Sequence, residues 1–318
     1  MRLIHAAAEL QPAGRPVCLA IGFFDGVHIG HQQVIRQTLA EARAMDALAL
    51  VVTFDRHPNS VVAPHRVPPL LYSLSQKLRH IGALGADALL LIHFDQTLSL
   101  QTGEEFIRGL AHDLGTIRSL CVGASFTFGH RRGGNLALLE RLGTELRFTA
   151  HGLHAVSWGG APVSSTRIRD QVAAGNLADA SRMLGRPYSL AGIVTRGDQL
   201  GRQLGFPTAN LDPAGILLPP HGVYAVRACL DGAFCPAVLN IGHRPTLGHS
   251  APQLRIEAHL LDFERDLYGV ELELVFVEKL REEQRFGSLD ELRHQIVTDV
   301  TVARAILAKE SGQRREDV

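Results

Sequence analysis

The sequence lacks the features that mark several large classes of protein. No apolar run reaches the roughly 18 residues needed to span a membrane, and the N-terminal segment lacks the long apolar core of a secretory signal. The four cysteines fit no close-spaced metal motif. Lys+Arg and Asp+Glu balance at 32 each, which gives no sign of bulk positive charge for nucleic acid. We therefore expect reduced cysteines, a cytoplasmic location, and no nucleic-acid or membrane partner.

The sequence also lacks the lysine P-loop, G-x-x-x-x-G-K-[ST], that commonly holds a nucleotide triphosphate. It has instead a glycine-rich turn from Gly22 to His31, between an apolar run and a helix-like segment. Glycines let the backbone approach phosphate oxygens closely, and the amides of a helix N-terminus attract the anion. His28 and His31 can then donate hydrogen bonds to the phosphates. This turn predicts a site for a nucleotide triphosphate.

Four short apolar runs in the first half predict strands that are buried on both faces. They are nearly continuous rather than alternating, as is typical of a parallel sheet, and they span Val17–Ile21, Leu48–Phe54, Ala88–Phe94 and Leu120–Gly123. Helix-like segments such as Gln32–Met45 and Gly103–Leu114 separate them. The order predicts a doubly wound, Rossmann-like α/β domain, which would bind ligands beyond the carboxyl ends of its strands.

A change of pattern near residues 185–190 predicts a domain boundary. Two short helices, Thr166–Ala173 and Leu177–Leu184, precede it, and Gly185 suits the position after a helix C-terminus. Beyond it, β-rich segments with partial alternation are separated by turns, which predicts an antiparallel barrel or sandwich. These segments are Val223–Leu230, Leu254–Leu260 and Leu272–Val277.

An amphipathic helix is expected to close the second domain. Ser288 and Glu291 form a capping box, and apolar residues follow at helical spacing, which we interpret as packing surface. The polar residues from Ser311 onward are expected to fray. The domains are accordingly placed at 1–186 and 187–310, with a polar tail at 311–318.

Two further segments of the first half have chemistry that could serve a nucleotide. The hydroxyls of Ser164, Ser165 and Thr166 stand at a helix start, where they can cap free amides. Two arginines in the same turn oppose the helix dipole, and a bound anion would remove that conflict. The turn Gly123–Gly129 is either part of a site or an ordinary glycine turn around two core phenylalanines.

The second half carries its own candidates. Gly197, Gly201 and Gly205 stand four residues apart and suggest a loop around a ligand, although a β-hairpin turn explains the same pattern. Because residues i and i+2 of a strand face one side, Thr208 and Asn210 can share one magnesium ion, which prefers hard oxygen ligands and phosphates.

Glu257 is the candidate general base of the second half. In Leu254–Leu260 the apolar residues fall on one face of the strand, whereas Arg255, Glu257 and His259 fall on the other. Glu257 therefore projects beside two basic neighbours. It is either a solvated strand residue or a base that takes a proton from a hydroxyl.

The first half resembles the nucleotidylyltransferase superfamily, whose mark is a His-x-Gly-His turn, and GFFDGVHIGHQQVI and VSSTRIR resemble bacterial FAD synthetases specifically. The resemblance implies that His28 and His31 bind ATP phosphates and stabilise the transferring phosphoryl centre. Asp25 would hold the loop or the metal, and further nucleotide contacts would come from Gly22, Phe24, Gly30, Ser164, Ser165, Thr166 and Arg167. Ser125 and Phe126 would contact the flavin, with Ser125 standing where the family is expected to have Asp or Asn.

The second half resembles the riboflavin kinase domain through the strings GRQLGFPTANL, GVYAV, NIGHRPTLG and IEAHLLDFERDLYG. The resemblance implies a six-stranded antiparallel barrel with a terminal helix. In it Thr208 and Asn210 would ligate magnesium and ATP phosphate, and Glu257 would activate the riboflavin 5′-hydroxyl. The glycines at 197, 201 and 205 would bind nucleotide, and the flavin would meet Asn240, Arg244 and Thr246.

From about residue 15 to 308 the chain thus resembles bacterial bifunctional riboflavin kinase/FAD synthetases. The implied substrates are riboflavin, FMN and ATP, with Mg²⁺ as the divalent cation and with possible transfer of FMN or FAD to apoflavoproteins. Three alternatives stay open. They are a kinase with weak or lost adenylylation, a transferase for another acceptor such as phosphopantetheine or nicotinamide mononucleotide, and a flavin-binding or storage protein.

Overall fold

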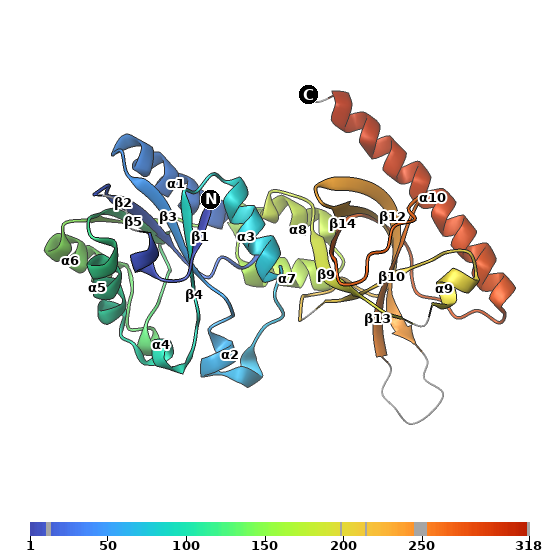
Figure 1. Ribbon diagram of the computed structural model, residues 1–318, viewed down its shortest axis with the longest axis horizontal. Coiled ribbons are helices and arrows are strands. Elements are labelled where there is room, and N and C mark those ends of the chain that lie inside the picture. Colours follow the sequence, from blue (N-terminus) through green and yellow to red (C-terminus); the bar gives the residue numbers. More distant parts are fainter. Residues whose placement is uncertain (11–13, 198, 214, 245–252, 317–318) are drawn as a thin grey trace. The chain divides into compact units, whose positions relative to one another are not determined.

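The computed structural model describes residues 1–10, 14–197, 199–213, 215–244 and 253–316 (Figure 1). The chain forms two compact units. The first comprises Met1–Leu70 and Leu74–Arg167, and the second comprises Leu71–Ser73 and Ile168–Val318. This division falls earlier in the chain than the boundary predicted at 186/187, so that the second short helix and most of the first are grouped with the second unit. The predicted boundary itself stays a prediction.

A six-stranded parallel sheet forms the core of the first unit, in the order β1-β4-β3-β2-β5-β6. Its strands are β1 (Arg2–Ile4), β2 (Val17–Ile21), β3 (Leu48–Phe54), β4 (Ala88–Ile92), β5 (Ile117–Gly123) and β6 (Thr149–Leu153). The four predicted runs correspond to β2 through β5. The two edge strands, β1 and β6, were not predicted, because one is very short and the other is only partly buried.

Helices cover both faces of this sheet. Alternate residues of β2 enter two different cores: Cys18 and Ala20 pack on one face, and Leu19 packs on the other. The first core is shared with α1 (Ile29–Ala44) and α3 (Leu74–Ala83), and the second with α5 (Gly103–Leu114) and α6 (Leu136–Leu146). Short elements complete the unit: η1 (Ala7–Glu9), η2 (Asp25–Val27), α2 (Asn59–Val62), η3 (Pro64–Arg66), α4 (Gln96–Leu100), η4 (His130–Arg132), β7 (Ser157–Trp158) and β8 (Ala161–Pro162). The doubly wound fold predicted from the sequence is confirmed.

The strand order reverses beside β2, which lies between β3 and β5. The chain passes from β2 to β3 and β4 before it returns to β5 on the other side of β2. The carboxyl ends of β2 and β5 therefore flank the switch point, where sheets of this kind bind their ligands. The turn Gly22–His31 follows β2, and Ser125 follows β5.

The second unit is built around a closed antiparallel barrel, as predicted. The strand order is β10-β13-β12-β11-β14-β9. The strands are β9 (Ser189–Thr195), β10 (Ala209–Asp212), β11 (Gly222–Leu230), β12 (Ala233–Arg244), β13 (Gln253–Leu260) and β14 (Glu271–Arg281). Helices α7 (Ser165–Ala173) and α8 (Leu177–Leu184) precede the barrel, and α9 (Leu200–Gln203) lies between its first two strands. Gly185 ends α8 with a φ of 73°, which confirms its predicted role.

The terminal helix α10 (Leu289–Glu316) packs on the outside of the barrel (Figure 1). Ala303 and Leu307 of this helix meet Val223, Ala225 and Val238 of the strands in one buried cluster. At its start, the Ser288 hydroxyl accepts a hydrogen bond from the amide of Glu291, as a capping box requires. The Glu291 carboxylate reaches back to the amide of Gly287 rather than to that of Ser288.

Helix α10 continues beyond Ser311 to Glu316, and the fraying expected from Ser311 onward stays a prediction. The last two residues lie outside the described part of the chain.

Two glycines of helix α5 should respond oppositely to the same substitution. Gly109 lies inside the helix and Gly115 ends it with a φ of 75°, and a Cβ would meet no atom within 4 Å at either position. Gly109→Ala should raise the free energy of unfolding by about 0.5–1 kcal/mol. Gly115→Ala should lower it by about 1–2 kcal/mol, because alanine is strained at that backbone conformation.

Urea denaturation followed by the fluorescence of Trp158, the single tryptophan, measures this difference in the first unit. Each variant serves as the control for the other, since only the backbone conformation distinguishes the two positions. Equal effects of the same sign would contradict the prediction.

Candidate active sites

The turn that follows β2 has a strained backbone. Phe24, Gly26 and Val27 have positive φ values of 53°, 81° and 40°. Glycine adopts such values freely, but a β-branched residue does so only where its surroundings force it. Gly22 is also required, because a Cβ at that position would lie 2.8 Å from the Phe24 ring. The turn then leads directly into α1.

His28 and His31 meet at the N-terminus of α1. Their rings stack with centroids 3.5 Å apart and planes inclined by 20°. His28 is buried, and its Nδ1 accepts a hydrogen bond of 3.3 Å from the amide of His31. A neutral His28 that accepts at Nδ1 carries its proton on Nε2, which makes that atom a donor. Gly30 leaves room for this ring, since a Cβ there would lie 3.2 Å from it.

Ser165 links the second predicted nucleotide segment to this turn. Its hydroxyl donates a hydrogen bond of 3.0 Å to the backbone carbonyl of Asp25, across 140 residues of sequence. Ser164 caps α7 by accepting from the amide of Arg167 at 3.2 Å. The structure therefore brings the two segments together, and the Ser164 hydroxyl also has the capping role considered for this segment.

Arg167 is tied to the β7–β8 hairpin. Its Nη1 donates to the carbonyls of Trp158 at 2.7 Å and Ala161 at 2.8 Å. This edge of the guanidinium is thus used by the fold, whereas Thr166 beside it is exposed. A contact of Arg167 or Thr166 with a triphosphate stays a prediction.

Sequence reasoning missed Lys77, which lies beside the turn on α3. The side chain is buried, with 4% of the residue exposed. Its ammonium donates to the carbonyls of Phe54 at 2.7 Å and Phe23 at 3.3 Å. Burial lowers the pKa of Lys77 to about 8, against the opposing attraction of Asp25 and Asp55. The signal in the sequence that could have drawn attention to Lys77 is the scarcity of lysine, which supplies three of the 32 basic residues.

Asp55, at the end of β3, forms a second polar cluster near the same sheet edge. Its carboxylate accepts from the amide of Phe94 at 3.0 Å and lies 2.7 Å from Nδ1 of His93. Burial alone would raise the pKa of Asp55, but these hydrogen bonds and the charges of Arg56 and His93 hold it below its ordinary value. Asp55 is thus a stable negative charge near Lys77.

The predicted flavin contacts of the first unit lie after β5. Ser125 is exposed. Phe126 stacks on Phe128 with centroids 5.3 Å apart and planes at 12°, and both rings pack against the core. One face of the Phe126 ring is therefore used in packing, as the ordinary interpretation of this turn expects, and its contact with a flavin stays a prediction.

In the second unit, Glu257 lies in a row of polar residues that crosses three strands. Asn210 of β10 and Asn240 of β12 are both directly paired with Glu257 of β13. Directly opposed residues of antiparallel strands point to the same face, with Cβ atoms about 5 Å apart. Val223 and Arg281 continue the row on β11 and β14. The barrel register therefore surrounds one carboxylate with two carboxamides.

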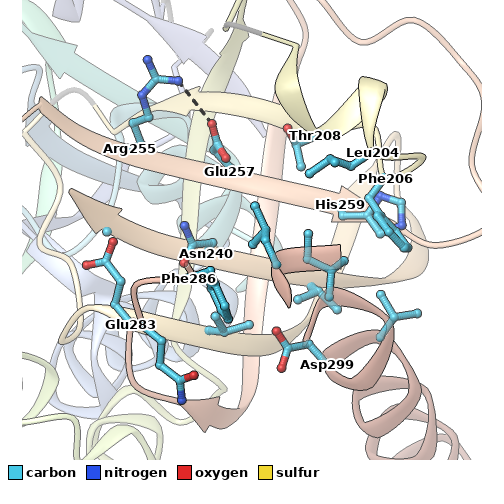
Figure 2. A pocket seen from close by; sticks show the side chains of 18 of the residues that line it. Leu204, Phe206, Thr208, Asn240, Arg255, Glu257, His259, Glu283, Phe286 and Asp299 are labelled. Atoms are coloured by element: carbon cyan, nitrogen blue, oxygen red, sulfur yellow. Dashed lines mark hydrogen bonds and ion pairs between the residues drawn. The ribbon is translucent and has the colours of Figure 1, made fainter. Parts of the chain in front are cut away.

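This face opens on a cavity of about 290 Å³ between the barrel and α10 (Figure 2). Figure 2 shows Glu257 pointing into it from β13, with Thr208 and Asn240 near it and Asp299 projecting from α10. The apolar part of the wall includes Leu204, Phe206, Val223, Val238, Phe286, Leu292, Ile296 and Val300. A mostly apolar wall with a few convergent polar groups suits a flat aromatic ligand with a polar tail.

Arg255 is the charged neighbour of Glu257. Its Nη1 lies 3.5 Å from Oε1 of Glu257, and both side chains are mostly buried (Figure 2). The alternation predicted for this strand is confirmed, because Ile256, Ala258 and Leu260 are buried on the opposite face. Leu254, assigned to that apolar face, is exposed.

Sequence reasoning also missed the ion pair that fixes α10 to the barrel. Arg281 binds both carboxylate oxygens of Asp299, through Nε at 3.0 and 3.1 Å and through Nη2 at 2.8 Å. The side chains are 16% and 7% exposed, and Gln295 donates to the same carboxylate at 2.9 Å. A buried bidentate pair of this kind sets the position of the cavity wall.

Glycine is required at position 242 of β12, which also lines the cavity. A Cβ at this position would collide with the carboxylate of Glu283, which accepts from the amide of His243 at 3.4 Å. Because residue 242 has no side chain, the Glu283 carboxylate can lie against β12 at the cavity (Figure 2).

The predicted nucleotide loop is only partly assembled at this cavity. Gly201 and Thr208 line it, whereas Gly197, Gly205 and Asn210 are not among the lining residues. A Cβ at Gly197 would collide with the Asn210 carboxamide, so that glycine is needed for packing. Two predicted flavin contacts cannot be placed: Thr246 and the side chain of Arg244 lie outside the described residues.

Family models match both halves of the chain. The model described as FAD synthetase matches residues 10–167, and the one described as riboflavin kinase matches residues 184–307. The bifunctional riboflavin kinase/FMN adenylyltransferase of Escherichia coli strain K12 is 39% identical over 306 residues, which cover 96% of this chain and 97% of that protein. The chain belongs to this bifunctional family.

A second member and a solved structure extend the likeness along nearly the whole chain. The family member from Pseudomonas fluorescens is 39% identical over 308 residues, with 97% of this chain and 98% of that protein covered. A crystal structure described as a macrolide-efflux protein from Streptococcus pneumoniae has a TM-score of 0.79 at 26% identity, and covers 95% and 98% of the two chains.

Within the described ranges of this chain, we find no helix with the length and apolar character needed to cross a membrane.

The buried Lys77 should make stability depend on pH above neutrality. The pKa is about 8 in the folded chain and 10.5 ordinarily. Between these values the unfolded chain binds the extra proton, so the stability of the folded state rises with pH. Relative to Lys77→Met, the free energy of unfolding of the wild type should rise by about 2–3 kcal/mol from pH 7 to 10.

Urea unfolding followed by Trp158 fluorescence at several pH values measures this difference. Subtracting the values for Lys77→Met removes the contribution of every other titrating group. A difference that stays constant from pH 7 to 10 would contradict the lowered pKa.

Proposed function

We propose that the chain makes FAD from riboflavin in two steps, one in each unit. Riboflavin and ATP give FMN and ADP in the barrel, and FMN and ATP then give FAD and pyrophosphate in the α/β unit. Family membership supports both activities. The single observation that carries the proposal is the row Asn210–Glu257–Asn240, which places one carboxylate at the cavity of the kinase unit.

In the kinase step, Glu257 acts as general base. Its carboxylate takes the proton of the riboflavin 5′-hydroxyl while that oxygen attacks the γ-phosphorus of ATP and ADP leaves. The Arg255 guanidinium, 3.5 Å from this carboxylate, holds its orientation in the cavity. Asn240 orients the acceptor, and the apolar wall with Phe286 excludes water.

Magnesium is the cation that we propose for this step. Among the residues that the structure describes, no group of three His, Cys, Asp or Glu side chains could hold a metal ion. A cation would therefore depend on substrate phosphates, and the neutral oxygens of Thr208 and Asn210 suit a magnesium ion bound in that way. When bound, it would neutralise phosphate charge.

In the adenylylation step, an FMN phosphate oxygen attacks the α-phosphorus of ATP, and pyrophosphate leaves. No general base is needed, because a phosphate monoester is already ionised at neutral pH. The task of the protein is alignment and charge stabilisation. We assign it to His28, His31 and the α1 amides, with Asp25 and Ser165 fixing the turn.

The remaining assignments follow the same division. Gly22, Phe24 and Gly30 shape the nucleotide site of the first unit, while Ser164, Thr166 and Arg167 border it. Ser125 and Phe126 would meet FMN there. Cytoplasmic location, domains at 1–186 and 187–310, and delivery of FMN or FAD to apoflavoproteins complete the proposal.

Variants of each site should separate the two activities. Glu257→Gln should abolish FMN formation, with a loss of about 100-fold or more, and should leave FAD formation from supplied FMN unchanged. His28→Ala combined with His31→Ala should do the reverse. Riboflavin or FMN is incubated with ATP and magnesium, and FMN and FAD are then separated chromatographically. If both folded variants lose both activities, the two-site assignment is wrong.

The same assay decides the alternative of a kinase with weak adenylylation, which the serine at position 125 favours. FAD formation from supplied FMN at a rate comparable to FMN formation removes that alternative. Kinase activity with almost no FAD supports it.

A further inference from the structure

Lys77 is buried although burial of an ammonium group is unfavourable, and neither of the two reaction steps above gives it a role. The chain has 32 basic residues, of which Lys77, Lys279 and Lys309 are lysines. Lys77 is 4% exposed, within α3 and close to the strained turn. A buried ammonium is unfavourable unless hydrogen bonds and opposite charge compensate it. Its partners therefore indicate what it is for.

The ammonium of Lys77 joins the carboxyl ends of two neighbouring strands. It donates to the carbonyl of Phe54, the last residue of β3, and to that of Phe23, two residues after β2 ends. The Phe23 carbonyl also accepts from the hydroxyl of Thr53 at 3.0 Å. The ammonium lies 4.4 Å from the centroid of the Phe23 ring, which adds a cation–π contact.

These contacts fix the backbone where the left-handed turn begins. The Phe23 carbonyl belongs to the peptide unit that leads into Phe24, which has a φ of 53°. Asp25, which follows, is 4% exposed, and its negative charge attracts the ammonium. At the other side of the turn, Ser165 donates to the Asp25 carbonyl. The turn is thus held at its entry by Lys77 and at its middle by Ser165.

We propose that Lys77 is a positioning residue for adenylylation. By binding the carbonyls of Phe23 and Phe54 and balancing the charge of Asp25, it keeps the strained turn in the shape that aligns His28 and His31. The proposal rests on the assignment of these histidines to the adenylylation site.

A direct contact between Lys77 and ATP does not fit its surroundings. Its donors point to backbone carbonyls, and almost none of the residue reaches the surface. A compact ammonium with three donors can satisfy two carbonyls and lie on a ring in this space. Its effect on the reaction therefore passes through the turn.

The test compares Lys77→Met with Lys309→Met, a matched control on the exposed face of α10. The assay measures kcat and KM for FAD formation from supplied FMN and ATP, and FMN formation from riboflavin in the same preparations. Unfolding is followed by Trp158 fluorescence. Lys77→Met should lower kcat for FAD formation about 100-fold, because small misplacements of catalytic groups cost this much. KM for ATP should change less than about threefold.

The kinase reaction serves as an internal control, and FMN formation by Lys77→Met should equal that of the wild type. Lys77→Arg, which keeps the charge, should recover about tenfold of the lost kcat. A merely structural role predicts instead that activity falls only in proportion to the folded fraction. That result, or a kcat within about threefold of the wild type, would overturn the proposal.

The design keeps two failures apart. If the double variant His28→Ala, His31→Ala still forms FAD, the histidine assignment itself fails, whatever Lys77→Met does. If the double variant is inactive and Lys77→Met is normal, the role of Lys77 alone fails. Should Lys77→Met not fold, Lys77→Gln replaces it, with an expected loss of about tenfold, and an unchanged kcat again overturns the proposal.

Discussion

The first unit depends on the packing of a charged ammonium between two strand ends. A parallel sheet leaves backbone carbonyls at its carboxyl edge, and a turn with several positive φ values cannot form there unless something holds it. Lys77 donates to the Phe23 and Phe54 carbonyls, and Ser165 donates to that of Asp25. The stacked histidines at the start of α1 are therefore a product of the whole sheet edge, not of the glycine-rich turn alone.

In the barrel, the register of strand pairing positions the residues of the site. Glu257 would be one more half-exposed strand glutamate if its neighbours were shifted by one residue, because every side chain would then change face. The observed pairing puts Asn210 and Asn240 on either side of it, and the Arg281–Asp299 pair holds α10 as the facing wall. Strand pairing and one buried ion pair therefore set two walls of the cavity.

The elements that the sequence predicted well are those with strong local signals. The buried runs of β2 to β5, the ends of α7 and α8, and the Ser288 cap follow from apolar periodicity and capping chemistry. Strands β1 and β6 were missed because a three-residue strand and a partly exposed edge carry little pattern. Lys77 and Asp299 were missed for a different reason. A charged residue in a helix is expected to face solvent, and the partners that bury it are distant in the sequence. The roles assigned to site residues stay predictions.

The central claim is that each unit contains a complete and separate site. Mixing two inactive enzymes tests it most directly: Glu257→Gln and the His28→Ala, His31→Ala double variant, incubated together with riboflavin, ATP and magnesium. The account predicts that neither variant by itself forms FAD from riboflavin. The mixture forms FAD after a lag, because FMN released by one protein must reach the other. A mixture of folded variants that accumulates FMN but never forms FAD would contradict it.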